Sequence, residues 1–253
     1  MNRMKVKPLF SILGTLLVLF IIVPIFRMVF SVSPSEAGSA LGQKELMSSI
    51  FLTLRASLWA TLIALILGIP LSFILARHDF FGKKIIEGLI DIPVVIPHTA
   101  AGIALLMVWG RESIFTRMTG ISIPGTEAAV SIGMLFVSLP FLVNSAKEGF
   151  KMIDVRYEKT AVSLGASPWK AFTSVSLPMA KKSIISGSIM MWARGISEFG
   201  AVVILAYHPM TAPVLIFERF QNFGLDYAAP ATVVLIIITL VIFVILRVVG
   251  DKQ

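Results

Sequence analysis

Residues 158–178 read EKTAVSLGASPWKAFTSVSLP and form a polar, well-punctuated stretch inside a chain that is otherwise strongly apolar. Asp154, just before this stretch, is suited to start a helix that ends at Gly165, because aspartate caps free amides and glycine tolerates the left-handed turn that closes a helix. Ser167 and Pro168 offer the cap and the first position of a second helix. The stretch is too polar to cross a bilayer and too well capped for a flexible tether, so the sequence predicts a structured loop between membrane spans.

The composition around this loop is that of an integral membrane protein. Of the 253 residues, 57% are hydrophobic and 14% are charged, whereas a soluble domain has about half and about a quarter. The chain has no cysteine, which excludes disulfides, thiolate ligands and cysteine nucleophiles. The net charge of +8 comes from short runs of lysine and arginine between apolar segments, which favours a topological role and argues against nucleic-acid binding.

Six apolar segments are long enough to cross about 30 Å of hydrocarbon as helices. The predicted spans are residues 8–30, 51–76, 94–109, 128–144, 184–206 and 228–246. The third and fourth are short, so each is expected to borrow flanking residues or to be sheltered by its neighbours. The first is too long for a signal peptide and is expected to be an uncleaved span. The sequence thus predicts an all-α integral membrane protein with six transmembrane helices and a single domain, residues 1–253.

The basic residues indicate how these spans are oriented. If the chain starts inside the cell, fifteen of the 22 lysines and arginines fall in cytoplasmic segments. Lysine and arginine accumulate on that side of the membrane. Both termini are therefore predicted to be cytoplasmic, and so is the loop of residues 154–178 between spans four and five.

Spacing alone leaves two interpretations of the loop open. Ala161, Gly165 and Ala166 have little or no side chain and allow another protein to approach the backbone, while Trp169 and Phe172 offer apolar anchors one turn apart. The same aromatic side chains and the nearby lysines would also suit a pair of helices lying on the lipid surface.

The order of residues in this loop resembles the EAA loop of ATP-binding-cassette (ABC) importer permeases: an acidic residue, a small one, Gly165 and, after nine more residues, a Val-x-Leu-Pro ending. In that family the loop forms coupling helices that seat in a groove of the ATPase subunit. Lys159 stands where the family usually has glutamate, and Thr160 replaces the first alanine. The resemblance implies that the residues coupling the chain to an ATPase are Glu158, Ala161, Gly165, Ala166, Ser167, Trp169, Leu177 and Pro178.

Two further segments extend the resemblance to most of the chain. DIPVVIPHTAAGIALL, residues 91–106, is similar to the entrance of the third span in permeases for molybdate, tungstate and sulfate, although His98 stands where a second proline is common. ARGISEFGAVVILAYHPMTAPVLIF, residues 193–217, resembles the fifth span of the same permeases through its Arg-x-x-x-Glu-Phe-Gly-Ala core. Its continuation is closer to the molybdate and tungstate group than to the sulfate group.

Arg194 is a charge within the predicted fifth span, and a charge at the centre of a bilayer costs at least about 2.5–3.5 kcal/mol on insertion scales. Glu198 lies one helical turn further along the same face and can neutralise it, and Ser197 adds a hydroxyl group. The pair is either a structural lock or part of the path for a dianion, with Gly200 allowing close packing or a bend. The candidate residues of the translocation path or gate are therefore Arg194, Ser197, Glu198 and Gly200.

The chain has no GxxxxGK[ST] phosphate loop and no histidine spacing typical of a metal site, so no ATP hydrolysis and no cofactor are expected in it. The resemblance implies a permease subunit in the cell (inner) membrane of a prokaryote, carrying molybdate or tungstate by alternating access. It implies a homodimer, a cytoplasmic ABC ATPase dimer that holds ATP and Mg²⁺, and an extracytoplasmic oxyanion-binding protein. The alternatives are a permease for sulfate or another anion, an ATP-independent channel or carrier, and an intramembrane enzyme.

Overall fold

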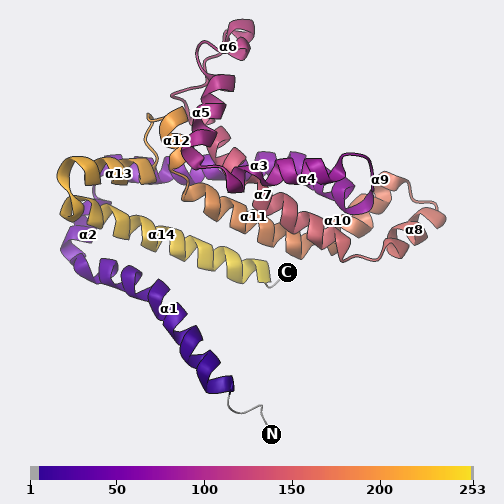
Figure 1. The fold of residues 1–253 in the computed structure, drawn as a ribbon, viewed down its shortest axis with the longest axis horizontal. Coiled ribbons are helices and arrows are strands. Elements are labelled where there is room, and N and C mark those ends of the chain that lie inside the picture. Colours follow the sequence, from indigo (N-terminus) through magenta and orange to yellow (C-terminus); the bar gives the residue numbers. More distant parts are fainter. Residues whose placement is uncertain (1–5, 252–253) are drawn as a thin grey trace.

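Three long helices form the centre of the molecule. The structure, a computed structural model, describes residues 6–251, and this part of the chain is helical without strands. Helices α3 (Lys44–Arg77), α7 (Glu127–Lys151) and α11 (Lys181–Ile196) pack side by side along the longest axis (Figure 1). The predicted all-α membrane fold is confirmed.

Small residues allow these three helices to approach one another closely. Ala56, Ala60 and Ala64 recur every fourth residue on the buried face of α3. Ser57 on the same face donates a hydrogen bond to the backbone oxygen of Trp192 on α11 at 2.7 Å. Lipid tails are as apolar as the side chains, so close van der Waals contact and interhelical hydrogen bonds replace the hydrophobic effect as the force between helices.

Four helices are long and apolar enough to cross a membrane, and they match the first, second, fourth and sixth predicted spans. They are α1 (Val6–Ser31), α3, α7 and α14 (Leu225–Asp251). Helix α1 leaves the body at an angle, and most of its side chains are exposed (Figure 1). Arg3, Lys5 and Lys252, which contributed to the predicted orientation, lie outside the described residues. The cytoplasmic location of both termini stays a prediction.

The third predicted span, residues 94–109, is not one straight helix. Helix α4 (Lys83–Val95) ends at Ile96, α5 (His98–Trp109) starts after Pro97, and the chain bends by 114° between them. A proline disfavours the helical conformation of the residue before it, and Ile96 is extended with ψ 148°. As a result, α5 and the short helix α6 (Ile114–Thr119) project from the body (Figure 1).

The fifth predicted span, residues 184–206, is also interrupted. Helix α11 ends at Ile196, and α12 (Gly200–Leu205) starts after a short non-helical connection and packs against α5. The described residues therefore contain four continuous candidate spans, or five if the bent α4–α5 pair counts as one. The number six stays a prediction.

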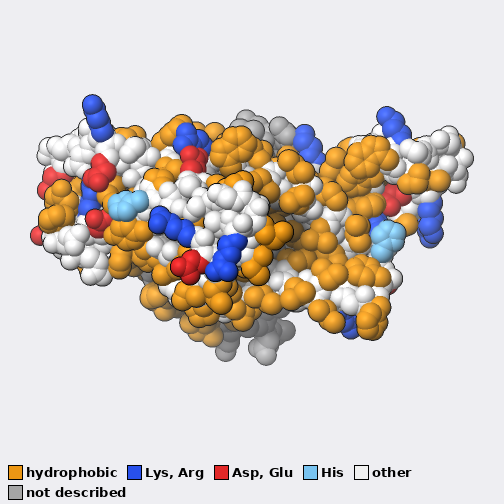
Figure 2. All heavy atoms as spheres, turned by 90° about the horizontal axis from the view of Figure 1, so that it is seen from above, with side chains coloured by type: hydrophobic (Ala, Val, Ile, Leu, Met, Phe, Trp, Pro, Cys, Tyr) orange, Lys and Arg blue, Asp and Glu red, His pale blue; other side chains and the backbone are white. Residues whose placement is uncertain are grey.

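Short helices cover the two ends of the long axis. Helices α2 (Pro34–Leu41) and α13 (Ala212–Phe223) lie at one end, and α8 (Val155–Ser163), α9 (Pro168–Ala171), the π-helix η1 (Phe172–Ser176) and α10 (Leu177–Met179) lie at the other. Figure 2 shows charged side chains gathered at both ends and in a patch near the middle, with hydrophobic side chains between them. The hydrophobic side chains between the ends suit a bilayer around that part of the molecule.

Candidate functional site

The loop of residues 154–178 starts its two helices where the sequence predicts. The expectation that Leu177 and Pro178 end the second helix was wrong, because both lie in α10 and the chain continues into α11. The side chain of Asp154 accepts a hydrogen bond from the Arg156 amide at 2.9 Å and caps α8, which ends at Ser163. Gly165 then adopts φ +93°, a conformation that favours glycine. Ser167 caps α9 by accepting a hydrogen bond from the Lys170 amide at 3.2 Å. The loop is therefore structured: α8 is followed, after Gly165, by the consecutive elements α9, η1 and α10.

One side of the loop faces outward and carries large apolar side chains among polar ones. Leu164 and Trp169 are 83% and 71% exposed, and Val162 is exposed beside them. A side-chain carbon added at Gly165 would meet nothing within 4 Å, so the backbone itself is accessible there. Of the remaining predicted coupling residues, Ser167 and Pro178 are exposed, while Ala161, Ala166 and Leu177 are half-buried. Exposed apolar side chains grouped in this way indicate a surface for a partner.

The other side of the loop faces the body and contains Glu158. Its Oε1 atom accepts hydrogen bonds from Arg77 Nε at 2.8 Å and from Ser176 Oγ at 2.7 Å. Phe172, which the sequence offered as an outward anchor, instead packs edge-on against Phe73 of α3 with ring centroids 4.8 Å apart. That expectation was wrong because η1 turns Phe172 toward α3 and α7. From the sequence, Arg77 was only one of the basic residues that indicate topology, and its contact with Glu158 was not predicted.

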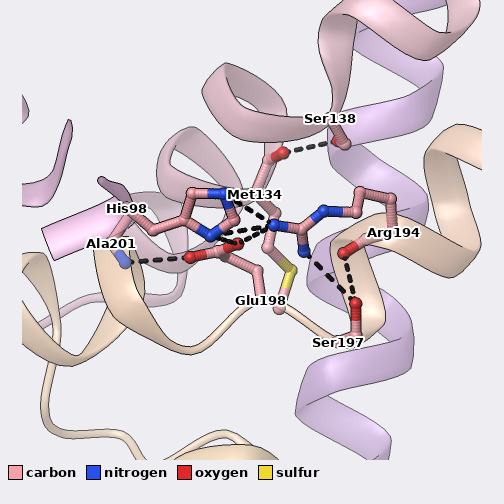
Figure 3. A network of polar contacts seen from close by, with 7 residues as sticks. All are labelled: His98, Met134, Ser138, Arg194, Ser197, Glu198 and Ala201. Carbon is pink, nitrogen blue, oxygen red and sulfur yellow. Dashed lines mark hydrogen bonds and ion pairs between the residues drawn. The ribbon is translucent and has the colours of Figure 1, made fainter. Parts of the chain in front are cut away.

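A second cluster of charged side chains lies where α11 is interrupted. Arg194 Nη2 lies 2.9 Å from Glu198 Oε2, and His98 Nδ1 lies 3.0 Å from the same oxygen (Figure 3). Oε1 of Glu198 accepts a hydrogen bond from the Ala201 amide at 2.9 Å. Arg194 Nη1 also donates to Ser197 Oγ at 3.2 Å. The predicted pairing of Arg194 with Glu198 is confirmed, and His98 is an additional member.

The two interrupted helices bring this cluster together. A side-chain carbon at Gly200 would lie 2.8 Å from Cβ of His98, and one at Gly102 would lie 2.8 Å from the backbone oxygen of Ala201. Only glycine allows α12 to approach the start of α5 this closely. The segments 91–106 and 193–217, which the sequence marked separately, therefore form one junction.

The burial of the cluster is uneven. The Glu198 side chain is completely buried, whereas those of Arg194 and His98 remain 23% and 34% exposed. A buried carboxylate is stable only when it is paired, and both partners converge on one of its oxygens. Among residues 6–251, no three His, Asp or Glu side chains are grouped closely enough to hold a metal ion.

The sequence of the chain matches a known family of membrane transport proteins. Residues 68–252 match the family model described as binding-protein-dependent transport system inner membrane component. The chain belongs to this family. The predicted family of ABC importer permeases is thereby confirmed, as is the location in the cell membrane as a multi-pass protein.

Family members with curated names are similar over almost the whole chain. The molybdate/tungstate transport system permease protein WtpB of Thermococcus kodakarensis is 44% identical over all of both chains, and that of Methanocaldococcus jannaschii is 42% identical over 93% of both. A probable sulfate transport system permease protein cysT of Chlorokybus atmophyticus is 34% identical over 78% of this chain and 70% of its own. These relatives are named as permeases, which agrees with the expectation that the chain is a transport subunit and no enzyme.

Solved structures share the fold. A bacterial ABC transporter involved in the import of alginate superposes with a TM-score of 0.77 over 97% of this chain and 96% of its own, at 13% identity. The inward-facing MetNI methionine ABC transporter superposes with a TM-score of 0.62 over 82% of this chain and 93% of its own, at 15% identity. At these identities the superpositions establish the fold.

Proposed function

We propose that this chain is the transmembrane permease subunit of an ATP-driven importer that carries molybdate and tungstate by alternating access. The observation that carries the proposal is its identity of 42–44% with WtpB proteins over at least 92% of their length. The similarity to a probable sulfate permease is lower and covers less of both chains. Sulfate is therefore the second candidate substrate.

The proposed assembly is a homodimer with a cytoplasmic ABC ATPase dimer and an extracytoplasmic oxyanion-binding protein. The exposed apolar side of the 154–178 loop supports the ATPase contact, because Leu164 and Trp169 lie on a polar loop outside the hydrophobic body. The projecting α5–α6 segment supports the homodimer, since its apolar residues Met107, Ile114 and Met118 are between 76% and 81% exposed. A second copy related by a two-fold axis would cover them. ATP and Mg²⁺ belong to the ATPase in this proposal.

The junction between α5 and α12 is the proposed gate of the translocation path. Arg194 offers a partly exposed guanidinium group whose charge is balanced by the buried Glu198, and Ser197 lies exposed beside it. A dianion passing this point would meet a cation and a hydroxyl donor, while the carboxylate stays hidden. Gly200 keeps the two segments in contact in the closed junction.

The test is co-purification with a candidate ATPase followed by anion uptake into liposomes. We expect Gly165→Arg to abolish both, because its side chain would project from the loop into the docking groove. Gly165→Ala controls for the strained φ without the bulk, and Gly82→Arg controls for bulk at another glycine with positive φ and open surroundings.

Two results would contradict the proposal. If Gly165→Arg binds the ATPase and supports uptake like the unaltered chain, the loop is not the docking site. If liposomes containing only this chain accumulate the anion without ATP, the chain is a channel or carrier. Competition among molybdate, tungstate and sulfate in the same assay identifies the substrate.

A further inference from the structure

The carboxylate of Glu158 is the point at which three helical segments meet. Arg77 is the last residue of α3, Glu158 lies on α8, and Ser176 is the last residue of η1. Arg77 Nε and Ser176 Oγ donate to Glu158 Oε1 at 2.8 and 2.7 Å, and Arg77 Nη2 lies 2.7 Å from the same oxygen. We call these three side chains the Glu158 clasp.

The clasp is shielded from water, unlike most ion pairs at this end of the molecule. The side chains of Arg77 and Glu158 are 6% and 16% exposed, whereas those of Lys151 and Glu148 in a neighbouring pair are 41% and 61% exposed. Charge-assisted hydrogen bonds are stronger and less screened when solvent is excluded. The clasp therefore holds its three segments in a defined arrangement.

Helix α3 has no direct chain connection to the loop. The loop follows α7 and continues through η1 and α10 into α11, so a displacement of the loop reaches those two helices through the backbone. Arg77 and Glu158 are 81 residues apart in sequence. The connection between α3 and the loop consists of side-chain contacts, namely the clasp and the packing of Phe172 against Phe73.

We propose that the Glu158 clasp transmits movement of the coupling loop to α3, so that α3, α7 and α11 move together when the ATPase displaces the loop. This inference rests on the proposed function and gives Arg77 the role of a positioning residue for coupling. Glu158 then acts through Arg77 inside the permease, and the ATPase contact belongs to the outward side of the loop. Breaking the clasp separates ATP hydrolysis from transport without removing the docking surface.

The test uses the complete complex, with its ATPase and binding protein, in liposomes. The ion pair is removed in two variants, Arg77→Gln and Glu158→Gln. Three quantities are measured: the amount of ATPase that co-purifies, the rate of ATP hydrolysis, and the amount of anion taken up per ATP hydrolysed. We expect normal co-purification and continued hydrolysis, with uptake per ATP reduced by about tenfold or more. Glu148→Gln, which breaks the exposed pair with Lys151, serves as the matched control and is expected to leave the ratio unchanged.

A covalent rescue distinguishes transmission from a general structural role. Because the chain has no cysteine, the double variant Arg77→Cys/Glu158→Cys can be linked by a short thiol-reactive crosslinker without side reactions elsewhere in it. We expect the unlinked variant to have a low uptake per ATP and the linked one to recover most of the normal ratio. A linked variant that stays uncoupled would overturn the inference.

Other outcomes separate this inference from the proposed function. Uptake per ATP within about twofold of normal in both glutamine variants would overturn the clasp alone. Loss of ATPase binding together with uptake in those variants would show that the clasp shapes the docking surface, which also overturns its transmission role. Failure of the unaltered chain to bind the ATPase would overturn the proposed function and this inference with it.

Discussion

Gly187 on α11 lies directly against Ser145 on α7. A side-chain carbon at Gly187 would come within 2.7 Å of Cβ of Ser145, and the hydroxyl of Ser145 donates to the backbone oxygen of Ser183 at 2.7 Å. The two helices are thus joined by close backbone approach and by a hydrogen bond one turn away. Both interactions require small residues at the interface.

We expect Gly187→Leu to destabilise the folded protein, because the new side chain has no space between α7 and α11. Overpacking of this kind costs about 1–3 kcal/mol in the free energy of unfolding. Thermal unfolding of the purified protein in detergent measures the loss. Gly88→Leu is the control, since a side-chain carbon at Gly88 would meet nothing within 4 Å, and an equal loss in both variants would contradict the packing argument.

Arg194→Met leaves the fully buried carboxylate of Glu198 without its arginine partner. Removing one member of a buried ion pair costs about 3–5 kcal/mol, and His98 is expected to compensate for part of it. The same unfolding measurement should show the double variant Arg194→Met/Glu198→Gln to be more stable than Arg194→Met alone, because no buried charge remains unpaired. A double variant that is less stable than Arg194→Met would show that the Glu198 charge is held by His98 and the Ala201 amide.

Local sequence signals predicted the loop and most of the long helices. Helix caps and turns depend on residues within one helical turn, so they can be predicted from the sequence. This holds for the caps Asp154 and Ser167 and for the turn at Gly165. The bend at Pro97 was missed because the apolar run continues through it, and hydropathy does not distinguish a straight span from a sharply bent one. Proline at this position, with a polar His98 after it, was the available signal.

The candidate site was predictable only where its members are close in sequence. Arg194 and Glu198 are four residues apart, so their pairing could be predicted from the sequence, although Glu198 lies in the non-helical connection that follows α11 and not on the helix itself. His98 lies 96 residues from Arg194, and Arg77 lies 81 residues from Glu158. Such contacts depend on how the helices pack, which periodicity and charge counting do not specify.

Two arginines near the α2–α13 end of the molecule, one buried and one exposed, should differ in their contribution to stability. Arg219 of α13 is 8% exposed and donates to Gln43 and Glu45 at 2.8 and 3.1 Å, while Arg55 of α3 pairs with Glu127 and is 46% exposed. We expect Arg219→Met to lower the free energy of unfolding by about 1.5–3 kcal/mol, the range for hydrogen bonds to a charged group.

Arg55→Met is the matched comparison and should cost about 1 kcal/mol or less, because exposed pairs are screened by water. Limited proteolysis adds a second readout, since loss of the Arg219 contacts with Gln43 and Glu45 should expose the connection between α2 and α3 to cleavage. Equal stability loss in the two variants would mean that burial does not decide the strength of these pairs.

Trp169 is expected to supply a large share of the binding energy between the loop and an ATPase. It is 71% exposed at the start of α9, and a tryptophan that fills a pocket of a partner contributes about 2 kcal/mol or more when truncated to alanine. Trp169→Ala should therefore weaken ATPase binding by roughly thirtyfold. Titration of the detergent-solubilised permease with the ATPase measures the change. Trp59→Ala removes a 53% exposed tryptophan from the apolar surface of α3 and should leave the affinity unchanged. Equal affinity for Trp169→Ala and the unaltered chain would contradict this contact and favour the alternative that the helices of the loop lie on the lipid surface.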